Sequence, residues 1–354
     1  MDPAFRVNNF DLLRILAAAQ VVYMHSIAHL GIPSPPITQI IAAFPGVPVF
    51  FALSGYLISA SYERTPDLRS YARNRLLRIL PALWCVVIVT TAVAAAFGYR
   101  FLNPTGVVWF MTQLVGLIWT PHFLKSFGFG SYNGSLWTIP IELQFYFLLP
   151  LLYAAARPPK RRTATLALAW LVSVVAVYVY ALHTPPLAET SDEPLPHKLV
   201  RYSFGPHIYL FLTGVLLQRW HAHRSRWIAG RGLFWLVGYI VLTRLVPTGA
   251  ASYVLCTLVM AVTVISLAFT VPRLAERVLR GNDLSYGVYI YHGLVLNVLI
   301  ERGVHARLAW LIPVFAATLA LAALSWWLVE KPFLRRKRNP LHPTAVATGR
   351  AERA

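Results

Sequence analysis

The first apolar run, residues 10–30, contains three ionisable side chains: Asp11, Arg14 and His25. Arg14 and His25 are eleven residues apart. At ~100° per residue this is about three turns plus 20°, so a helix places them on one face together with Asp11. The rise between them is roughly 16 Å. Charged groups are costly to insert into a membrane and indicate function by default. A histidine in a dry site can act as a general base or as the nucleophile that carries an acyl group.

Glutamate and histidine recur inside two later apolar segments. Glu142 lies about six residues inside the outer end of its predicted span, with Tyr146 one turn further on. His25 lies at about the same depth, so a glutamate there could orient its imidazole. Alternatively, the glutamate could bind a sugar hydroxyl. His292 follows the stretch Ser-Tyr-Gly-Val-Tyr-Ile-Tyr and lies near mid-membrane. Helix packing is the alternative explanation, since polar side chains also join helices by hydrogen bonds.

A pair of arginines, Arg75 and Arg78, stands where another apolar run begins. Their i, i+3 spacing puts both guanidinium groups on one face of a helix. Basic residues at a cytoplasmic helix end commonly set membrane topology. The alternative is a clamp for phosphate groups, which match the planar donor fork of arginine. The spacing leaves both interpretations open.

The composition predicts a membrane protein. Of the 354 residues, 57% are hydrophobic and 13% are charged, about half of the usual charged share of a soluble domain. The formal net charge of +19 does not indicate nucleic-acid binding, because the basic residues form short clusters between long apolar runs. The two cysteines both lie inside apolar segments, which argues against a disulfide-stapled secreted domain. No metal site is predicted.

Hydropathy gives eleven candidate spans near the ~20 residues that cross a bilayer. They cover residues 10–30, 45–62, 78–97, 106–120, 136–156, 164–182, 204–219, 232–247, 251–271, 284–301 and 309–330. Basic clusters lie within 64–78, 157–162, 219–231, 273–280 and the C-terminal tail. If 106–120 does not cross, all five clusters and both termini face the cytoplasm, as the positive-inside rule expects.

We therefore predict an all-α, polytopic membrane protein with ten transmembrane helices. Residues 106–120 would be re-entrant or interfacial, and loop 183–203 would face outward. The first run is expected to be a retained helix, because a signal peptide keeps its core free of charge. Residues 1–334 would form one transmembrane domain, followed by a basic, disordered cytoplasmic tail at 335–354.

Six segments together resemble the family-three membrane acyltransferases, which O-acylate bacterial surface polysaccharides, lipids and some small natural products. The segments are Asp-Leu-Leu-Arg followed after ten residues by His25, Phe-Phe-Ala-Leu-Ser-Gly-Tyr-Leu, Arg75-Leu-Leu-Arg78, Ser-Leu-Trp-Thr-Ile-Pro-Ile-Glu-Leu-Gln-Phe-Tyr, Ser-Tyr-Gly-Val-Tyr-Ile-Tyr-His and Glu-Lys-Pro. Each is weakly specific alone, but all six occur in the right order over roughly residues 8–334.

The resemblance implies roles for individual residues. It matches Arg14 and His25 to the family's arginine–histidine pair, in which the histidine is regarded as catalytic. It implies that Arg75 and Arg78 meet the phosphates of acyl-coenzyme A, and it matches Glu142 to the glutamate of the Trp-Thr motif. The candidates are His25, Glu142 and Asp11 as catalytic residues, Arg14, Arg75 and Arg78 as donor-binding residues, and Tyr146 and His292 as substrate-binding residues.

Two features depart from the family pattern. Leu12 stands where many members have glycine, which can alter how the first helix packs. No soluble hydrolase-like domain follows the last span, so we expect transfer to be completed by this chain alone or with a partner. The predicted activity transfers an acyl group, with acetyl favoured, from acyl-coenzyme A. We expect acyl-coenzyme A to act as a co-substrate and not as a tightly bound cofactor. The acceptor is a hydroxyl of a carbohydrate or lipid-linked carbohydrate, and the expected location is the bacterial inner membrane.

A proton-coupled transporter or flippase is the alternative function. Its proton relay would consist of Asp11, Arg14, His25, Glu142 and His292. Many transporters are built from internal repeats with broken helices, and no such repeat is evident in the sequence. A non-catalytic membrane scaffold is a third class. The residues leave open the acceptor, the acyl chain, the oligomeric state, and whether the histidine acts as base or as covalent carrier.

Overall fold

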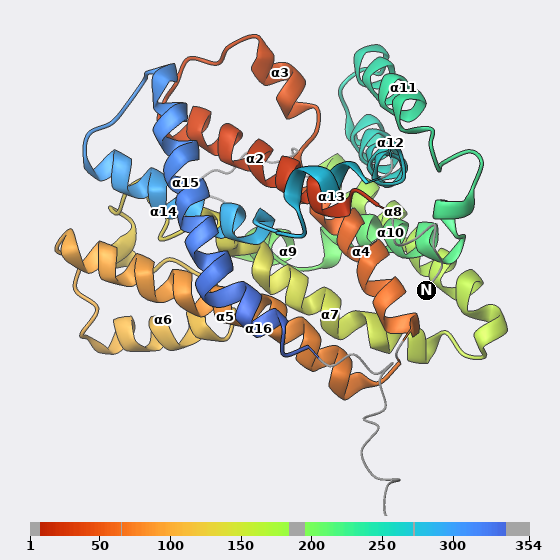
Figure 1. Cartoon of the computed structure of the whole chain (residues 1–354), viewed down its shortest axis with the longest axis horizontal. Coiled ribbons are helices and arrows are strands. Elements are labelled where there is room, and N and C mark those ends of the chain that lie inside the picture. The colour runs from red at the N-terminus through yellow and green to blue at the C-terminus, as the bar shows by residue number, and fades with distance from the viewer. Residues whose placement is uncertain (1–7, 65, 184–194, 272, 338–354) are drawn as a thin grey trace, which may run out of the picture.

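The computed structural model describes residues 8–64, 66–183, 195–271 and 273–337, and this part of the chain forms helices and no β-strand (Figure 1). The helices are α2 (Phe10–His29), α3 (Ile37–Ala42), α4 (Gly46–Arg64), α5 (Leu68–Ala96), α6 (Pro104–Leu114), α7 (Thr138–Ala155), α8 (Arg162–His183), α9 (Leu195–Arg201), α10 (Ile208–Arg219), α11 (Gly232–Leu245), α12 (Ala250–Ala268), α13 (Leu274–Leu279), α14 (Ser285–Glu301), α15 (Leu311–Ser325) and α16 (Lys331–Leu334). A π-helical turn, Trp326–Glu330, joins α15 to α16. The prediction of an all-α fold is confirmed for these residues.

Seven helical segments are long and apolar enough to cross a membrane. They are Phe10–His29, Ile37–Arg64, Leu68–Ala96, Gly134–Ala155, Pro159–His183, Ala250–Ala268 and Leu308–Leu334. The three remaining predicted spans correspond to α10, α11 and α14, with 12, 14 and 17 residues. At 1.5 Å per residue these helices are shorter than a ~30 Å hydrocarbon core. A multi-pass membrane protein is therefore supported, whereas the count of ten spans stays a prediction.

Other helices enclose α10 and α14. Every residue is buried over 209–218 and over 285–297. The backbone of α10 approaches α4 closely, because a Cβ added at Gly55 would lie 1.9 Å from the carbonyl oxygen of Phe211. Small residues permit such close approach of two helices, so Gly55 is explained by packing. Where a helix is too short to cross the membrane, the non-helical backbone at its ends is tolerated at membrane depth if protein surrounds it.

Helix α6 and the segment after it fold back on themselves. The 11 residues of α6 rise about 16 Å, roughly half of the hydrocarbon core. The indole of Trp109 donates to the main-chain oxygen of Trp119 at 2.8 Å, and the indole of Trp119 donates to Thr112 Oγ1 at 2.8 Å. This compact shape suits the re-entrant or interfacial position predicted for residues 106–120.

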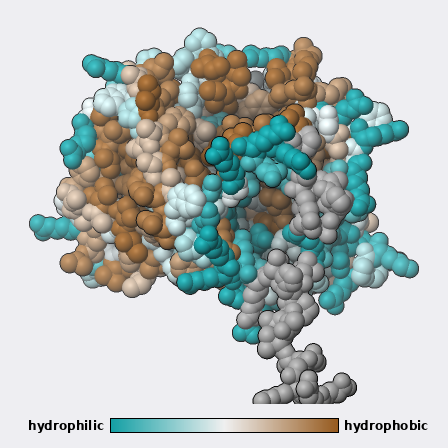
Figure 2. Space-filling view, in the orientation of Figure 1, coloured by the Kyte–Doolittle hydropathy of each residue, from teal (hydrophilic) through white to brown (hydrophobic). Residues whose placement is uncertain are grey.

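Contacts bring the described basic clusters to one end of the helix bundle. Arg219, at the end of α10, pairs with Glu63 at the end of α4. Asn9, just before α2, accepts a hydrogen bond from the main-chain N–H of Ala275 in α13 at 2.9 Å. Figure 2 shows hydrophobic side chains over much of the left of this face, where α5, α14 and α15 lie, and hydrophilic ones near the lower centre, where the described chain ends. The ten-span topology puts all basic clusters on one side of the membrane, so it requires them to lie at one end of the bundle.

The prediction that this end faces the cytoplasm is tested by cysteine accessibility. At the opposite end of the bundle, Ala306 donates a main-chain hydrogen bond to Leu30 at 2.8 Å. In a background with Cys85 and Cys256 replaced, a cysteine at Arg277 should react with a membrane-impermeant reagent only from the cytoplasmic side. A cysteine at position 305, next to Ala306, should react only from outside. The reverse pattern would contradict the predicted orientation.

Two predictions fall largely outside the described residues. The outward loop at 183–203 overlaps residues 184–194, and the disordered tail at 335–354 overlaps residues 338–354.

Candidate active site

His25 and His292 form the centre of the candidate site. Nδ1 of His25 lies 2.9 Å from Nε2 of His292, and this contact joins α2 to α14. Nδ1 of His292 lies 2.7 Å from the main-chain oxygen of Tyr289, one turn earlier in α14. The imidazole of His292 is fully buried. Two histidines predicted from separate segments therefore form one hydrogen-bonded pair.

The partners of the ring nitrogens assign the protons of this pair. A carbonyl oxygen only accepts, so Nδ1 of His292 carries a hydrogen and donates to Tyr289. In the neutral imidazole, Nε2 of His292 is then an acceptor, and His25 donates to it from Nδ1. Nε2 of His25 therefore keeps its lone pair. We assign His25 as the group that can take a proton or attack a carbonyl, and His292 as the group that fixes its tautomer.

The loop before α7 is held against the C-terminal end of α14, and it contacts the residue one turn beyond His25. His29 lies one turn beyond His25, with ring centroids 5.3 Å apart, and stacks on Phe129 at 4.0 Å. The main-chain N–H of Gly128 donates to Glu301, the last residue of α14, at 2.8 Å. Phe129 of this loop is therefore the aromatic ring next to the histidines, and Glu301 anchors the loop.

A buried ion-pair group lies about three turns away along α2. Asp283, directly before α14, accepts from Arg14 at 3.2 Å and from Arg78 at 2.5 Å, both through Oδ2. The side chain of Asp283 is only 12% exposed. The predicted face of α2 that bears Arg14 and His25 therefore contacts one segment at both ends: Arg14 meets Asp283, and His25 meets His292.

Arg75 is less constrained than Arg78. Its Nη2 donates to the hydroxyl of Ser61 at 3.0 Å, and its guanidinium carbon lies 5.8 Å from the ring centroid of Tyr146. Its Nε is buried and has no hydrogen-bond partner among the residues that the structure describes. Arg78, by contrast, is paired with Asp283, which it shares with Arg14. Of the two predicted phosphate ligands, Arg75 is the one available for an added anion.

Lys337 adds a fourth basic group at this end. It follows α16, outside the membrane-spanning segments. Desolvation and the positive charges of Arg78, Arg75 and Arg14 lower the pKa of Lys337 to about 7. Repulsion among these cations would be relieved by an anion placed between them.

Glu142 lies on the Arg14 side of the site. It accepts a hydrogen bond from the phenol of Tyr146, one turn later in α7. Together with Arg14 and Tyr289 it lines a cavity of about 30 Å³, large enough for a water molecule. Within the described ranges, Glu142 makes no hydrogen bond to His25. The structure therefore offers no contact through which Glu142 orients the imidazole, whereas the cavity leaves its carboxylate open to a small polar group.

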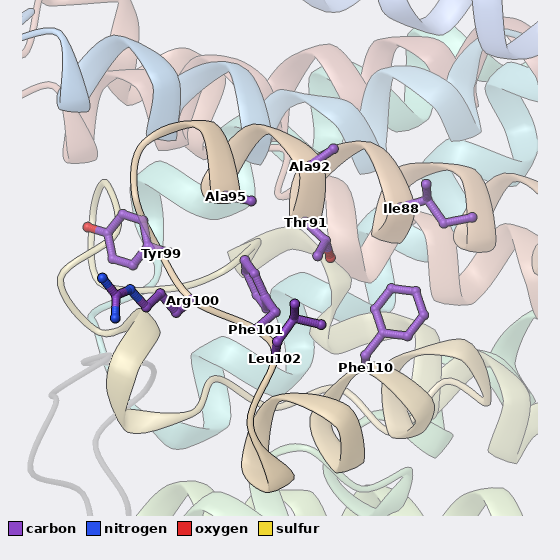
Figure 3. A pocket seen from close by; sticks show the side chains of 9 residues that line it. All are labelled: Ile88, Thr91, Ala92, Ala95, Tyr99, Arg100, Phe101, Leu102 and Phe110. Carbon is purple, nitrogen blue, oxygen red and sulfur yellow. The ribbon is translucent and has the colours of Figure 1, made fainter.

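An open, mostly apolar cavity of about 560 Å³ lies between α5 and α6 (Figure 3). Ile88 of α5 and Phe110 of α6 line it, and Arg100 lies at one end. Tyr99, next to Arg100, donates to Glu301 at 3.1 Å. The cavity therefore borders the C-terminal end of α14, where the loop before α7 also contacts Glu301.

The sequence prediction does not include Asp283, although a signal for it exists. An arginine inside a span needs a compensating charge, and Asp283 is a carboxylate directly before an apolar span. The main-chain N–H of Ser285 donates to Asp283 at 3.1 Å, a local side-chain bond of the kind aspartate often makes in turns. Asp11, which is predicted to be catalytic, lies exposed at the start of α2, roughly 21 Å from His25 along the helix.

Comparisons with known proteins agree with this architecture. The chain matches the acyltransferase domain of the acyltransferase-3 family over residues 7–329. It is 33% identical to nodulation protein 10 of Rhizobium leguminosarum bv. viciae, over 94% of each chain. It is 27% identical to the O-acetyl transferase of Shigella phage Sf6, over 94% of this chain and 98% of that one. No solved structure matches the chain. Because the family match covers nearly the whole described helical body, the chain belongs to the acyltransferase-3 family of membrane acyltransferases.

Proposed function

We propose that this membrane acyltransferase moves an acetyl group from acetyl-coenzyme A to a hydroxyl of a carbohydrate or lipid-linked carbohydrate in the bacterial inner membrane. One observation carries the proposal: the hydrogen bonds from His25 to His292 to the carbonyl of Tyr289 leave a single basic nitrogen at Nε2 of His25. The phage relative is an O-acetyl transferase by name, which favours acetyl as the group and oxygen as the acceptor.

In the direct route, His25 acts as a general base. Nε2 takes the proton of the acceptor hydroxyl while the hydroxyl oxygen attacks the thioester carbon. The carbon–sulfur bond breaks, and the imidazolium returns the proton to the leaving sulfur, giving coenzyme A and the ester. His292 stabilises the transient imidazolium, because it keeps accepting from the Nδ1–H of His25.

In the covalent route, Nε2 of His25 attacks the thioester carbon itself. Coenzyme A leaves as the thiolate, and an acyl-imidazolium remains whose Nδ1–H still donates to His292. The acceptor oxygen then attacks the acyl carbon, the carbon–nitrogen bond breaks, and the hydroxyl proton passes through the freed Nε2 to water, which balances the proton taken up by the thiolate. This route gives ping-pong kinetics, whereas the direct route needs one ternary complex. The same tautomer serves both routes, so initial-rate kinetics distinguish them.

The donor would enter from the end that holds the basic clusters. Arg75 offers positive charge for its phosphates, and a phosphate placed there would favour the protonated form of Lys337. Arg14 lies about 16 Å from His25 along α2. The small cavity at Glu142 lies beside Arg14 on this side of the site. A pantetheine arm that follows this face of α2 would bring the thioester to His25, with side chains around the cavity moving aside.

A lipid-linked acceptor would suit the cavity between α5 and α6. The apolar lining offers a surface for a hydrocarbon tail, and Arg100 offers a cation for a phosphate of its carrier. Through Tyr99 and Glu301 this cavity adjoins the loop beside the histidines. The carbohydrate of such an acceptor could then reach the histidine pair.

The acceptor is identified first, by mass spectrometry of polysaccharides, lipids and secreted metabolites from cells with and without the gene. Purified protein in vesicles is then given acetyl-coenzyme A and that acceptor. The proposal expects coenzyme A to be released only when the acceptor is present. Movement of either molecule across the vesicle without release of coenzyme A would instead identify a transporter.

Arg75→Ala should weaken donor binding, because a guanidinium–phosphate contact contributes ~1.5–3 kcal/mol. Arg75→Lys should rescue binding only in part, since lysine lacks the planar fork. The double variant Arg75→Ala/Arg78→Ala should weaken donor binding further. It also removes one of the two arginines that pair with Asp283. The measurement is coenzyme A affinity of purified protein, with exposed Arg73→Ala on the same helix as the control. Unchanged affinity in the double variant would leave both arginines as topology signals.

A further inference from the structure

A second basic cavity lies apart from Arg75 and Arg78. It measures about 590 Å³ and opens where α4, α7, α8 and α10 end or begin. Its lining includes the basic residues Arg157, Arg162, Arg219 and His221, and one carboxylate, Glu63. Three arginines around a single carboxylate give the cavity a net positive charge.

The single carboxylate is already fully engaged. Glu63 forms an ion pair with Arg219 through Oε1. The same oxygen accepts from the phenol of Tyr153 at 3.1 Å, and Oε2 accepts from Nε2 of Gln218 at 3.1 Å. Glu63 and Arg219 therefore neutralise each other, and the charges of Arg157 and Arg162 are left uncompensated.

Arg162 is held ready for a further partner. Its guanidinium carbon lies 5.0 Å from the ring centroid of Tyr153, which is within the range of a cation–π contact. Its Nε is buried and lacks a hydrogen-bond acceptor within the described chain. Buried donors in proteins are nearly always paired, and this one borders an open cavity with room for an acceptor. Arg157 is exposed at the same cavity and forms no ion pair with a described residue.

The surroundings place the cavity at the edge of the membrane. Trp220 directly follows Arg219 and is 58% exposed, and Leu151 of α7 is 49% exposed. An exposed tryptophan at a helix end is typical of the headgroup region. The ring of Tyr62 packs between Tyr71 and Tyr153, at 5.1 and 5.4 Å, and so separates this cavity from the Arg75 side.

We propose that this cavity binds a phosphate group, with Arg157 and Arg162 as its ligands. The forked donors of two arginines match the oxygens of a phosphate. The phosphate can come from the headgroup of an anionic phospholipid of the adjoining leaflet, for which basic pockets between membrane helices are suited. It can also come from the 3′-phosphate of coenzyme A, reached around Tyr62. Only this second source rests on the proposed function.

The test compares Arg157→Gln/Arg162→Gln with Lys160→Gln/Arg161→Gln. The control removes two charges from the same connection, at exposed residues that do not line the cavity. Full-length protein is reconstituted in phosphatidylcholine with a quarter phosphatidylglycerol, and retained phosphatidylglycerol is counted by native mass spectrometry. In parallel, the affinity for coenzyme A is compared with that for 3′-dephospho-coenzyme A.

Wild type and control should either retain phosphatidylglycerol or bind coenzyme A more tightly than its dephospho form. In the cavity variant, the retained lipid or the ratio of the two affinities should fall by about tenfold or more. Loss of lipid retention identifies a lipid phosphate, and loss of the 3′-phosphate preference identifies the donor. If neither property differs between variant and control, the proposal is overturned. Arg157→Gln alone, at an exposed residue, gives the same comparison if the double variant unfolds. Coenzyme A release in the transfer assay is measured separately, so failure of the cavity proposal leaves the role of His25 unaffected.

Discussion

His25→Ala should lower acyl transfer by ~10²–10⁴-fold, the usual loss when a positioned proton-transfer group is removed. The loss should be larger if His25 carries the acyl group, because no other group would replace the nucleophile. The reason is the assignment of protons: Nε2 of His25 is the one ring nitrogen of the pair whose lone pair is not engaged in the hydrogen bonds of the pair. Transfer rate and melting temperature are measured on the same purified variant.

Retained stability is what separates a catalytic histidine from a structural one. Coenzyme A affinity should also stay near that of wild type, because the basic end of the site lies roughly 16 Å away along α2. An active His25→Ala enzyme would refute the mechanism. Activity lost together with melting temperature would indicate that His25 mainly joins α2 to α14.

His292 should behave as a positioning residue. His292→Ala removes the acceptor that fixes the tautomer of His25, so transfer should fall less than in His25→Ala. The base itself remains, so the pH–rate profile of His292→Ala should still show one titrating group, whereas that group should be missing in His25→Ala. Equal losses with the same flat profile would show that the two histidines act as one unit.

Helical periodicity predicted one half of this site. The spacing of Arg14 and His25 placed both on one face of a helix, and both do contact the same segment, 283–292. The contact of Glu142 with Tyr146 is also local, since the two residues are one turn apart on α7. In each case the geometry of a single helix determines the result.

Partners from distant segments could not be predicted in this way. Arg14 and Asp283 are 269 positions apart, and His25 and His292 are 267 apart. Such pairs depend on how α2 packs against α14, which periodicity does not specify. The bounds of these spans were predicted closely: span 284–301 corresponds to α14, and span 204–219 to the 3-10 turn Gly205–His207 and α10. Whether such short segments cross the membrane could not be predicted, because hydropathy does not distinguish lipid from protein as the surroundings of α10 and α14.

Asp283→Asn should destabilise the protein by ~3–5 kcal/mol, the usual cost of breaking a buried ion pair by removing one partner. Asparagine keeps the size of the side chain and can still accept from Ser285, so the change isolates the charge. Arg14 and Arg78 would then face each other in a site with little access to water. Thermal unfolding in detergent is the measurement. Glu276→Gln, which removes an exposed carboxylate of nearby α13, should change the melting temperature little.

The source of the destabilisation is tested by removing the excess charge as well. If unpaired arginines are the cause, Asp283→Asn combined with Arg14→Met should be more stable than Asp283→Asn alone, because a buried ion pair can be replaced by apolar packing. The double variant should nevertheless be poor in transfer, since Arg14 belongs to the predicted donor path. An Asp283→Asn protein that melts like wild type would show that water or another carboxylate compensates the two arginines. Measuring stability and activity on the same variants therefore distinguishes two roles of Asp283 and its two arginines. Asp283 holds α2, α5 and α14 together, and the arginines that it pairs with face the proposed path of the donor.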